Sequence, residues 1–273
     1  MPRFGSTPLA FPDFKGATRR LILINLAAYF ALLVANIALR NQSIDLAGSL
    51  GLVPGLFLHG NIWQPLTYSF VHIGLWGTFL ELLSLWFLAG FLEMQGHSPS
   101  WVMGLYAVSV LGTAAAALAI YAASPTLGYS ISFVPITGCF GGIFGLLAVI
   151  GLLYGDVQFM MFPLPIGIKA RYLVIIYALV SIAMLFSAQR MYAFAQLGGA
   201  LAGMMWARMA PRRGVSFLLS ENWYGLRNRY YRWKRRRAAR KFEVYMRSQG
   251  RTVRFDGHGR QLDEDPDDKK RWN

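Results

Sequence analysis

The chain has 273 residues, 55% of them hydrophobic, and a mean hydropathy of +0.38. Several apolar runs are long enough for a helix to cross the hydrocarbon core of a bilayer, so we predict a multi-pass helical membrane protein. The single cysteine, Cys139, excludes an intramolecular disulfide. Most of the net charge of +14 lies after residue 209, which is typical of cytoplasmic flanking charge; contact with nucleic acid or ribosomes is the alternative.

Residues 1–18 are polar and rich in proline, glycine and phenylalanine, and they lack the pattern of a cleavable signal. Arg19 and Arg20 separate them from the first apolar run, residues 21–39. Because positive charges favour the inner side of a membrane, we predict that residues 1–18 form a cytoplasmic leader.

The connection over residues 41–76 contains Asp45 but no lysine or arginine, which indicates the outer side. Leucine, isoleucine, phenylalanine and tryptophan recur through it. A connection this apolar is typical of an element that lies in the edge of the bilayer.

Further apolar runs follow, and charges in the connections fix their predicted direction. Lys169 and Arg171 mark a cytoplasmic connection broken by prolines, whereas Gln189 and Arg190 form a short outer turn. Both termini are then cytoplasmic. The six predicted spans are residues 21–39, 75–92, 101–121, 137–154, 172–186 and 192–209.

Glycines recur at helical spacing in two of these runs. Gly138, Gly141 and Gly145 follow the i, i+3, i+7 pattern, and Gly199 and Gly203 form a GxxxG pair. Such bare helix faces let neighbouring helices approach closely, so we expect both faces inside the bundle and not at a partner surface.

These features resemble the rhomboid family of intramembrane proteases, in order, over residues 21–209. The segment His-Gly-Asn-Ile-Trp-Gln-Pro-Leu-Thr-Tyr-Ser-Phe-Val-His, residues 59–72, matches the family's first loop, Gly-x-x-Trp-Gln-x-x-Thr-x-x-Phe-x-His. The second predicted span ends with the glutamate and glycine typical of the family. Residues 138–141, Gly-Cys-Phe-Gly, correspond to Gly-x-Ser-Gly, and residues 195–199, Ala-Gln-Leu-Gly-Gly, correspond to Ala-His-Leu-Gly-Gly. The resemblance implies an all-α, six-helix membrane bundle.

The resemblance also implies where the catalytic groups of a rhomboid would lie. Phe140 stands at the position of the serine nucleophile and Gln196 at that of the histidine base, and neither side chain can perform that role. Gly77 and Glu81 replace the histidine and asparagine that help to hold the oxyanion. We therefore expect a catalytically inactive rhomboid-like pseudoprotease, with no catalytic residues and no cofactor.

Cysteine catalysis is an alternative, because Cys139 directly precedes the serine position. One residue along a helix turns a side chain by about 100°, so we expect Cys139 to be buried and inert. His72 lies nearest in the outer half, but it resembles a structural residue of the family. His97 and His258 are isolated, and the sequence predicts no metal site.

Glu81 is an ionisable group inside a predicted span, which makes it a candidate functional residue. Nine residues of helix would place it roughly 13 Å from His72. We predict that Glu81 and Gln196 hydrogen-bond to each other where the catalytic residues once lay, with Phe140 filling space. A solvated Glu81 that faces a water-filled cavity is the alternative.

Residues 210–250 are predicted to form a basic, aromatic cytoplasmic helix after the membrane domain of residues 19–209, and residues 251–273 form a charged tail that includes a possible hairpin at 251–262. Basic and aromatic side chains together suit anionic lipid headgroups or a protein partner, and nucleic acid is the less favoured alternative. The candidate contact residues of this helix are Trp223, Tyr230, Trp233, Arg235, Arg236 and Arg237.

Within the superfamily, the chain resembles the derlins and inactive rhomboids, which bind membrane proteins and govern their trafficking, turnover or assembly. The resemblance implies a non-catalytic binder of transmembrane segments that uses the groove beside the second and fifth spans, or a subunit of a larger membrane assembly. A protease with unconventional chemistry and a tether for ribosomes or nucleic acid are the alternatives. No transit-type leader is present, which favours a bacterial inner membrane.

Overall fold

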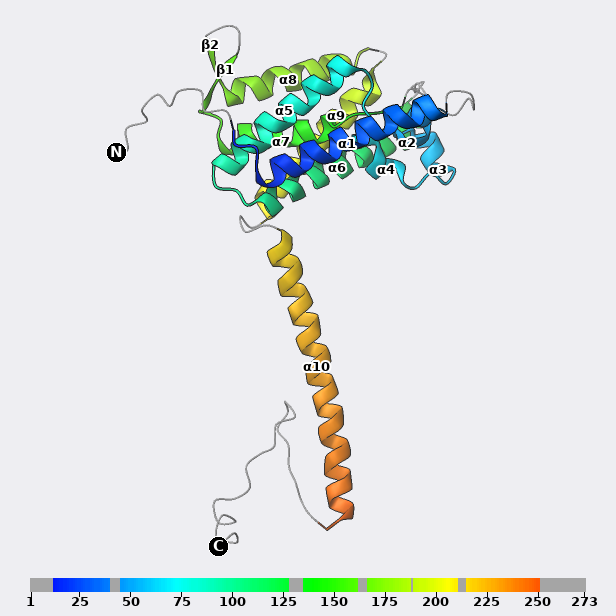
Figure 1. Cartoon of the computed structure of the whole chain (residues 1–273), viewed down its shortest axis with the longest axis vertical. Helices are drawn as coiled ribbons and strands as arrows, with labels where there is room; N and C mark the ends of the chain where they lie inside the picture. The colour runs from blue at the N-terminus through cyan, green and yellow to red at the C-terminus, as the bar shows by residue number, and fades with distance from the viewer. Residues whose placement is uncertain are drawn as a thin grey trace, which may run out of the picture. The chain divides into compact units, whose positions relative to one another are not determined.

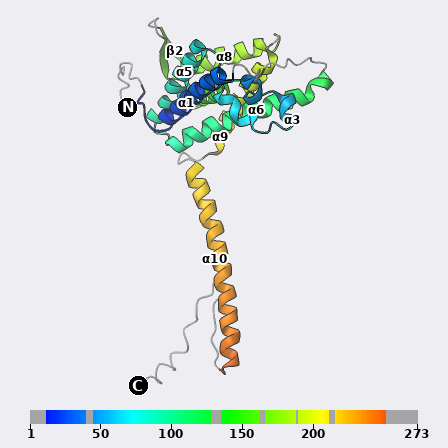
Figure 2. The same ribbon diagram turned by 45° about the vertical axis from the view of Figure 1, so that its right-hand side comes forward.

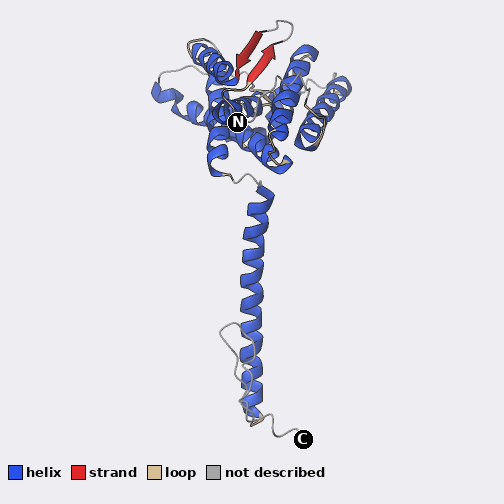
Figure 3. Cartoon of the chain, turned by 90° about the vertical axis from the view of Figure 1, so that its left-hand side faces the viewer, coloured by secondary structure: helices blue, strands red, loops and turns tan. Residues whose placement is uncertain are grey.

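A computed structural model describes residues 12–39, 45–127, 135–161, 166–187, 189–210 and 215–250. The chain divides into two compact units, Met1–Val215 and Ser216–Asn273. The possible hairpin at residues 251–262 and the rest of the charged tail lie outside the described residues. Figure 3 shows that helices dominate, with a single pair of strands among the described residues.

Six long helices form the bundle of the first unit (Figures 1 and 2). They coincide with the six predicted apolar runs. Four short helical elements lie between the first two of them. The long helices are α1 (Gly16–Ala38), α5 (Leu75–Met94), α6 (Pro99–Leu127), α7 (Phe140–Leu153), α8 (Ala170–Met184) and α9 (Arg190–Met209); the short ones are α2 (Leu46–Leu50), α3 (Pro54–Leu58), α4 (Gln64–Thr67) and the 3-10 helix η1 (Tyr68–Phe70).

Within the described residues, three helices are long and apolar enough to cross a membrane: Gly16–Ala38, Leu75–Met94 and Pro99–Thr126. The apolar helices α7 and α8 are shorter, with 14 and 15 residues. A multi-pass helical architecture is therefore supported, whereas the count of six spans stays a prediction.

The helix α1 begins earlier than the apolar run predicts, because a distant carboxylate caps it. Glu93, at the end of α5, accepts hydrogen bonds from the backbone N–H of Ala17 at 2.7 Å and of Thr18 at 3.3 Å. The Thr18 hydroxyl also donates to it, at 2.6 Å. An anion at a helix N-terminus satisfies free N–H groups and suits the helix dipole. As a result, Arg19 and Arg20 lie inside the helix.

The centre of the bundle is α7, in which every residue from 141 to 150 is buried. Gly141, Gly145, Gly199 and Gly203 lie inside the bundle, as predicted, and they bring α7 and α9 together. A Cβ added at Gly199 would lie 2.6 Å from the carbonyl oxygen of Gly141, and one added at Gly203 would lie 2.8 Å from Cα of Gly145. The prediction for Gly138 was wrong, because this residue precedes α7 with φ +87° and is not on a helix face.

A two-stranded antiparallel sheet between α7 and α8 was not predicted. Strand β1 (Gln158–Met161) pairs with β2 (Ile166–Lys169), in a register that sets Gln158 opposite Lys169. Phe159 of β1 contacts Phe87 and Phe91 of α5, with ring centroids 5.3 and 5.1 Å apart. The hairpin thus packs on the end of α5.

The second unit contains α10 (Val215–Ser248), a helix of 34 residues. From residue 227 onward nearly all of its side chains are exposed. These exposed side chains include aromatic residues as well as arginine and lysine, so the part of α10 whose side chains the structure describes buries little within its own unit.

Candidate functional site

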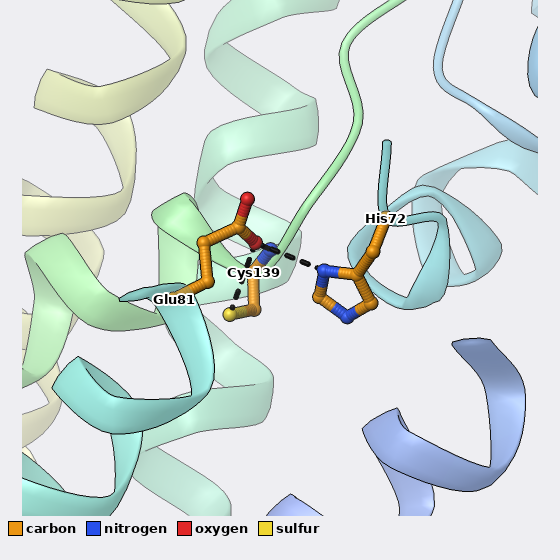
Figure 4. Close-up of side chains that lie close together, drawn as sticks. All are labelled: His72, Glu81 and Cys139. Carbon is orange, nitrogen blue, oxygen red and sulfur yellow. Dashed lines mark hydrogen bonds and ion pairs between the residues drawn. The ribbon is translucent and has the colours of Figure 1, made fainter. Parts of the chain in front are cut away.

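The carboxylate of Glu81, on α5, is buried at the N-terminus of α7. Its Oε2 atom accepts a hydrogen bond from the backbone N–H of Cys139 at 2.9 Å and one from the Cys139 thiol at 3.4 Å (Figure 4). Cys139 is the N-cap of α7, and the dipole of that helix favours a negative charge there. A Cβ at Gly138 would lie only 2.7 and 2.9 Å from the two carboxylate oxygens, so glycine leaves the room that the carboxylate occupies.

His72 contacts the same carboxylate from the turn before α5. Its Nδ1 lies 3.0 Å from Oε2 of Glu81, and its Nε2 lies 3.1 Å from Oδ1 of Asn25 on α1. Asn25 is fully buried, and its amide nitrogen donates to the carbonyl oxygen of Leu21 at 2.7 Å. A continuous polar chain therefore runs through the apolar interior from α1 to α7.

The predicted separation of His72 and Glu81 along a helix was wrong. The helix α5 begins only at Leu75, and Gly74 before it has φ +78°, a conformation that side chains with a Cβ rarely adopt. The turn lets the chain change direction, so the imidazole of His72 reaches the carboxylate of Glu81 directly (Figure 4).

The predicted hydrogen bond between Glu81 and Gln196 was also wrong. Gln196, on α9, accepts a hydrogen bond from the hydroxyl of Ser181 on α8, at 2.9 Å. Glu81 instead satisfies the N-terminus of α7. The Glu81 side chain is only 9% exposed, whereas the alternative prediction was a carboxylate surrounded by water.

One small cavity of about 10 Å³ is lined by Phe140 and Gln196. These residues align with the nucleophile and the base of rhomboid proteases. That volume holds about one water molecule. Tyr68 also lines it; burial raises the pKa of its phenol, so the hydroxyl stays protonated and donates to the carbonyl oxygen of Val110 at 2.8 Å. Phe140 is 39% exposed, and its space-filling role stays a prediction.

A second, larger cavity of about 460 Å³ lies between α5 and α8, with α7 at its back. Gly77, Glu81 and Phe140, three of the four positions that the resemblance aligns with catalytic groups, line it. Leu80 and Tyr177 face each other across α5 and α8 as walls of this cavity, and their exposed fractions are 58% and 46%. The cavity is therefore open and mostly apolar, and Glu81 supplies its carboxyl group.

Sequence reasoning missed the grouping of His72, Glu81 and Cys139. Their potential ligand atoms all lie within 4.8 Å of one another, and all three residues are buried. Asn25 carried a usable signal, because a buried polar residue within an apolar run requires a partner. Its partner, however, lies 47 positions away in the sequence, so no local pattern identifies it.

The basic helix α10 carries a cluster of aromatic and basic side chains. The ring of Trp233 lies 6.2 Å from that of Tyr230, and the guanidinium of Arg237 lies 5.4 Å from the Trp233 ring. Arg235 and Arg236 are exposed beside them. The side chain of Trp223 lies outside the part that the structure describes.

The apolar helices and the glycine-mediated packing of α7 on α9 indicate an integral membrane protein built as a helical bundle. The family model for the rhomboid domain matches residues 59–213. The chain therefore belongs to the rhomboid family. Among curated proteins, none matches the chain significantly.

Proposed function

We propose that this rhomboid-family chain is a non-catalytic binder of transmembrane segments, which it holds in the cavity between α5 and α8. The observation that carries the proposal is the cavity itself, of about 460 Å³ and lined mainly by apolar side chains of α5, α7 and α8. An open apolar groove between two helices suits an apolar helix of another membrane protein. The partner is an integral membrane protein, either a transient client or a fixed neighbour in a larger assembly.

The absence of proteolysis is part of the proposal. Phe140 offers no nucleophilic group, and the amide of Gln196 does not accept a proton near neutral pH. Glu81 places a carboxylate at the helix N-terminus, where donors for a developing oxyanion would be needed. Labelling of Cys139 or of any serine by a thiol-directed or fluorophosphonate probe would favour the alternative, a protease with unconventional chemistry.

Photo-crosslinking tests the groove directly. A photoreactive amino acid at position 80 or 177, in the groove, is expected to capture membrane proteins, whereas one at Val34, on the exposed face of α1, is not. Ser84→Trp would fill the groove and abolish capture, and Val34→Trp serves as the matched control. Equal capture from all three positions, or capture unaffected by Ser84→Trp, would rule out the groove as the binding site.

For the basic helix α10, we propose contact with anionic lipid headgroups at the cytoplasmic surface, with both termini of the chain on that side. The exposed arginines next to Tyr230 and Trp233 support this proposal, because aromatic rings prefer the membrane interface and cations prefer anionic lipid. Nucleic acid and a protein subunit are the alternative partners. Strongly salt-dependent RNA binding that is lost with residues 216–273 would favour nucleic acid.

A further inference from the structure

Three side chains with different ligand atoms converge in the interior of the bundle. His72 contributes a ring nitrogen, Glu81 a carboxylate oxygen and Cys139 a sulfur, and these atoms lie within 4.8 Å of one another. They come from three separate segments: the turn after η1, the helix α5 and the N-cap of α7 (Figure 4). The convergence is therefore a property of the tertiary fold and not of a local motif.

The hydrogen bonds of Asn25 fix the orientation of the imidazole. Because the amide nitrogen of Asn25 donates to the carbonyl oxygen of Leu21, its Oδ1 is left to accept from His72 Nε2, which must carry a hydrogen. In the neutral ring, Nδ1 then presents a lone pair toward Oε2 of Glu81, only 3.0 Å away. Two acceptors at this distance need a positive centre between them, which is either a proton or a metal ion.

We propose that His72, Glu81 and Cys139 bind a divalent transition-metal ion, with zinc as the best match. Nitrogen, carboxylate oxygen and thiolate sulfur are the ligands that zinc takes in proteins. Bonds of about 2.0–2.3 Å in tetrahedral geometry place such ligand atoms about 3.4–3.6 Å apart. The observed separations from Glu81 Oε2 are 3.0 Å to His72 Nδ1 and 3.4 Å to Cys139 Sγ, and all three ligand atoms lie within 4.8 Å of one another. Closing the site around a metal ion requires the imidazole and the sulfur to approach each other by up to about 1 Å.

The surroundings have the features of a metal site. A histidine that binds metal through one nitrogen usually donates from the other to a fixed oxygen, which is the role that Asn25 fills here. Gly138 keeps the space beside the carboxylate free of a side chain. Glu81 also lines the large cavity, so a water molecule from that side can supply the fourth ligand. The inference does not depend on whether the cavity binds transmembrane segments.

Cobalt titration of the full chain in detergent, stripped with a chelator, tests the proposal. A thiolate bound to Co²⁺ gives a charge-transfer absorption, and only Cys139 can produce it because the chain has one cysteine. We expect one equivalent of Co²⁺ to generate this absorption, Zn²⁺ to displace it, and Zn²⁺ to raise the thermal midpoint of the protein.

Variants separate the ligands from the positioning residue. Cys139→Ser should remove the absorption, and Glu81→Gln and His72→Asn should each weaken zinc binding at least about tenfold. Asn25→Ala should retain the absorption with affinity lowered about 10- to 100-fold, because Asn25 acts only through His72. His59→Asn, at an exposed histidine, is the control and should change nothing.

Two results would overturn the metal site. One is a wild-type chain that shows no thiolate–cobalt absorption, a measurement that needs no variant and is independent of variant folding. The other is stoichiometric metal uptake that persists in both Glu81→Gln and His72→Asn, with helix content and gel-filtration profile unchanged. In either case protons alone hold these three groups together.

Discussion

Glu93 is a single residue that holds two helices together. It accepts hydrogen bonds from Ala17 and Thr18 at the start of α1, although it lies 76 and 75 positions away on α5. Charged hydrogen bonds of this kind each stabilise by about 1.5–3 kcal/mol. We therefore expect Glu93→Ala to lower the free energy of unfolding by about 2–4 kcal/mol, measured by denaturation in mixed micelles.

Asp156 provides the matched control for this prediction. Its carboxylate is 80% exposed and pairs with Arg171 at 2.7 Å, and surface ion pairs contribute about 0–1 kcal/mol. Asp156→Ala should therefore have a small effect. Equal losses of stability in Glu93→Ala and Asp156→Ala would show that the cap contributes no more than a surface pair.

A second residue-scale prediction concerns the proposed absence of proteolysis. Introducing a hydroxyl with Phe140→Ser should leave proteolysis at background, because Gln196 is no base and, in a soluble serine protease, loss of the base alone costs about 10⁶ in kcat. The double variant Phe140→Ser, Gln196→His should also stay inactive, because the Glu81 carboxyl group still accepts the backbone N–H of Cys139 that an oxyanion would need. Cleavage of a transmembrane substrate in proteoliposomes is the measurement, and product from the double variant would contradict this argument.

At the scale of elements, the sequence allows the long helices to be predicted, because apolar runs of that length have few alternatives in a membrane. The site could be predicted only in part. The contact between His72 and Glu81 depends on the turn at Gly74, and that of His72 with Asn25 depends on how α1 packs. The sheet was missed because each strand has only four residues, too few for alternation to identify.

Replacing a glycine by alanine should change stability in opposite directions at Gly199 and at Gly77. A Cβ at Gly199 on α9 would lie 2.6 Å from the backbone of Gly141 on α7, so Gly199→Ala must separate the two helices. We expect a loss of about 3 kcal/mol or more. At Gly77 on α5 no atom lies within 4 Å of an added Cβ, so Gly77→Ala should stabilise by up to about 1 kcal/mol through helix propensity.

Thermal unfolding of the two alanine variants beside the wild type measures this difference. The two substitutions add the same methyl group to a helix, so composition and side-chain size are matched. A Gly199→Ala variant as stable as Gly77→Ala would mean that α7 and α9 do not approach as closely as the glycines permit.

At the scale of the whole molecule, the two units differ in the surface that they present. The first unit presents apolar surface suited to lipid tails, whereas α10 presents arginine, lysine and aromatic side chains. Each basic residue near an anionic membrane contributes about 1 kcal/mol. Neutralising Arg235, Arg236 and Arg237 together should thus weaken binding of the second unit to anionic vesicles about 100-fold. High salt should also weaken this binding, because it screens the charges.

The outcome of this experiment distinguishes lipid from a partner that reads arginine geometry. Replacing the three arginines by lysine preserves charge but removes the planar, forked donor of the guanidinium. Because anionic lipid responds chiefly to charge, the lysine variant should bind vesicles nearly as well as the wild type, and a variant with glutamine at the three positions should not. Loss of vesicle binding in both variants would contradict attraction by charge alone. It would indicate that the guanidinium groups form bidentate hydrogen bonds with phosphate groups held in fixed positions.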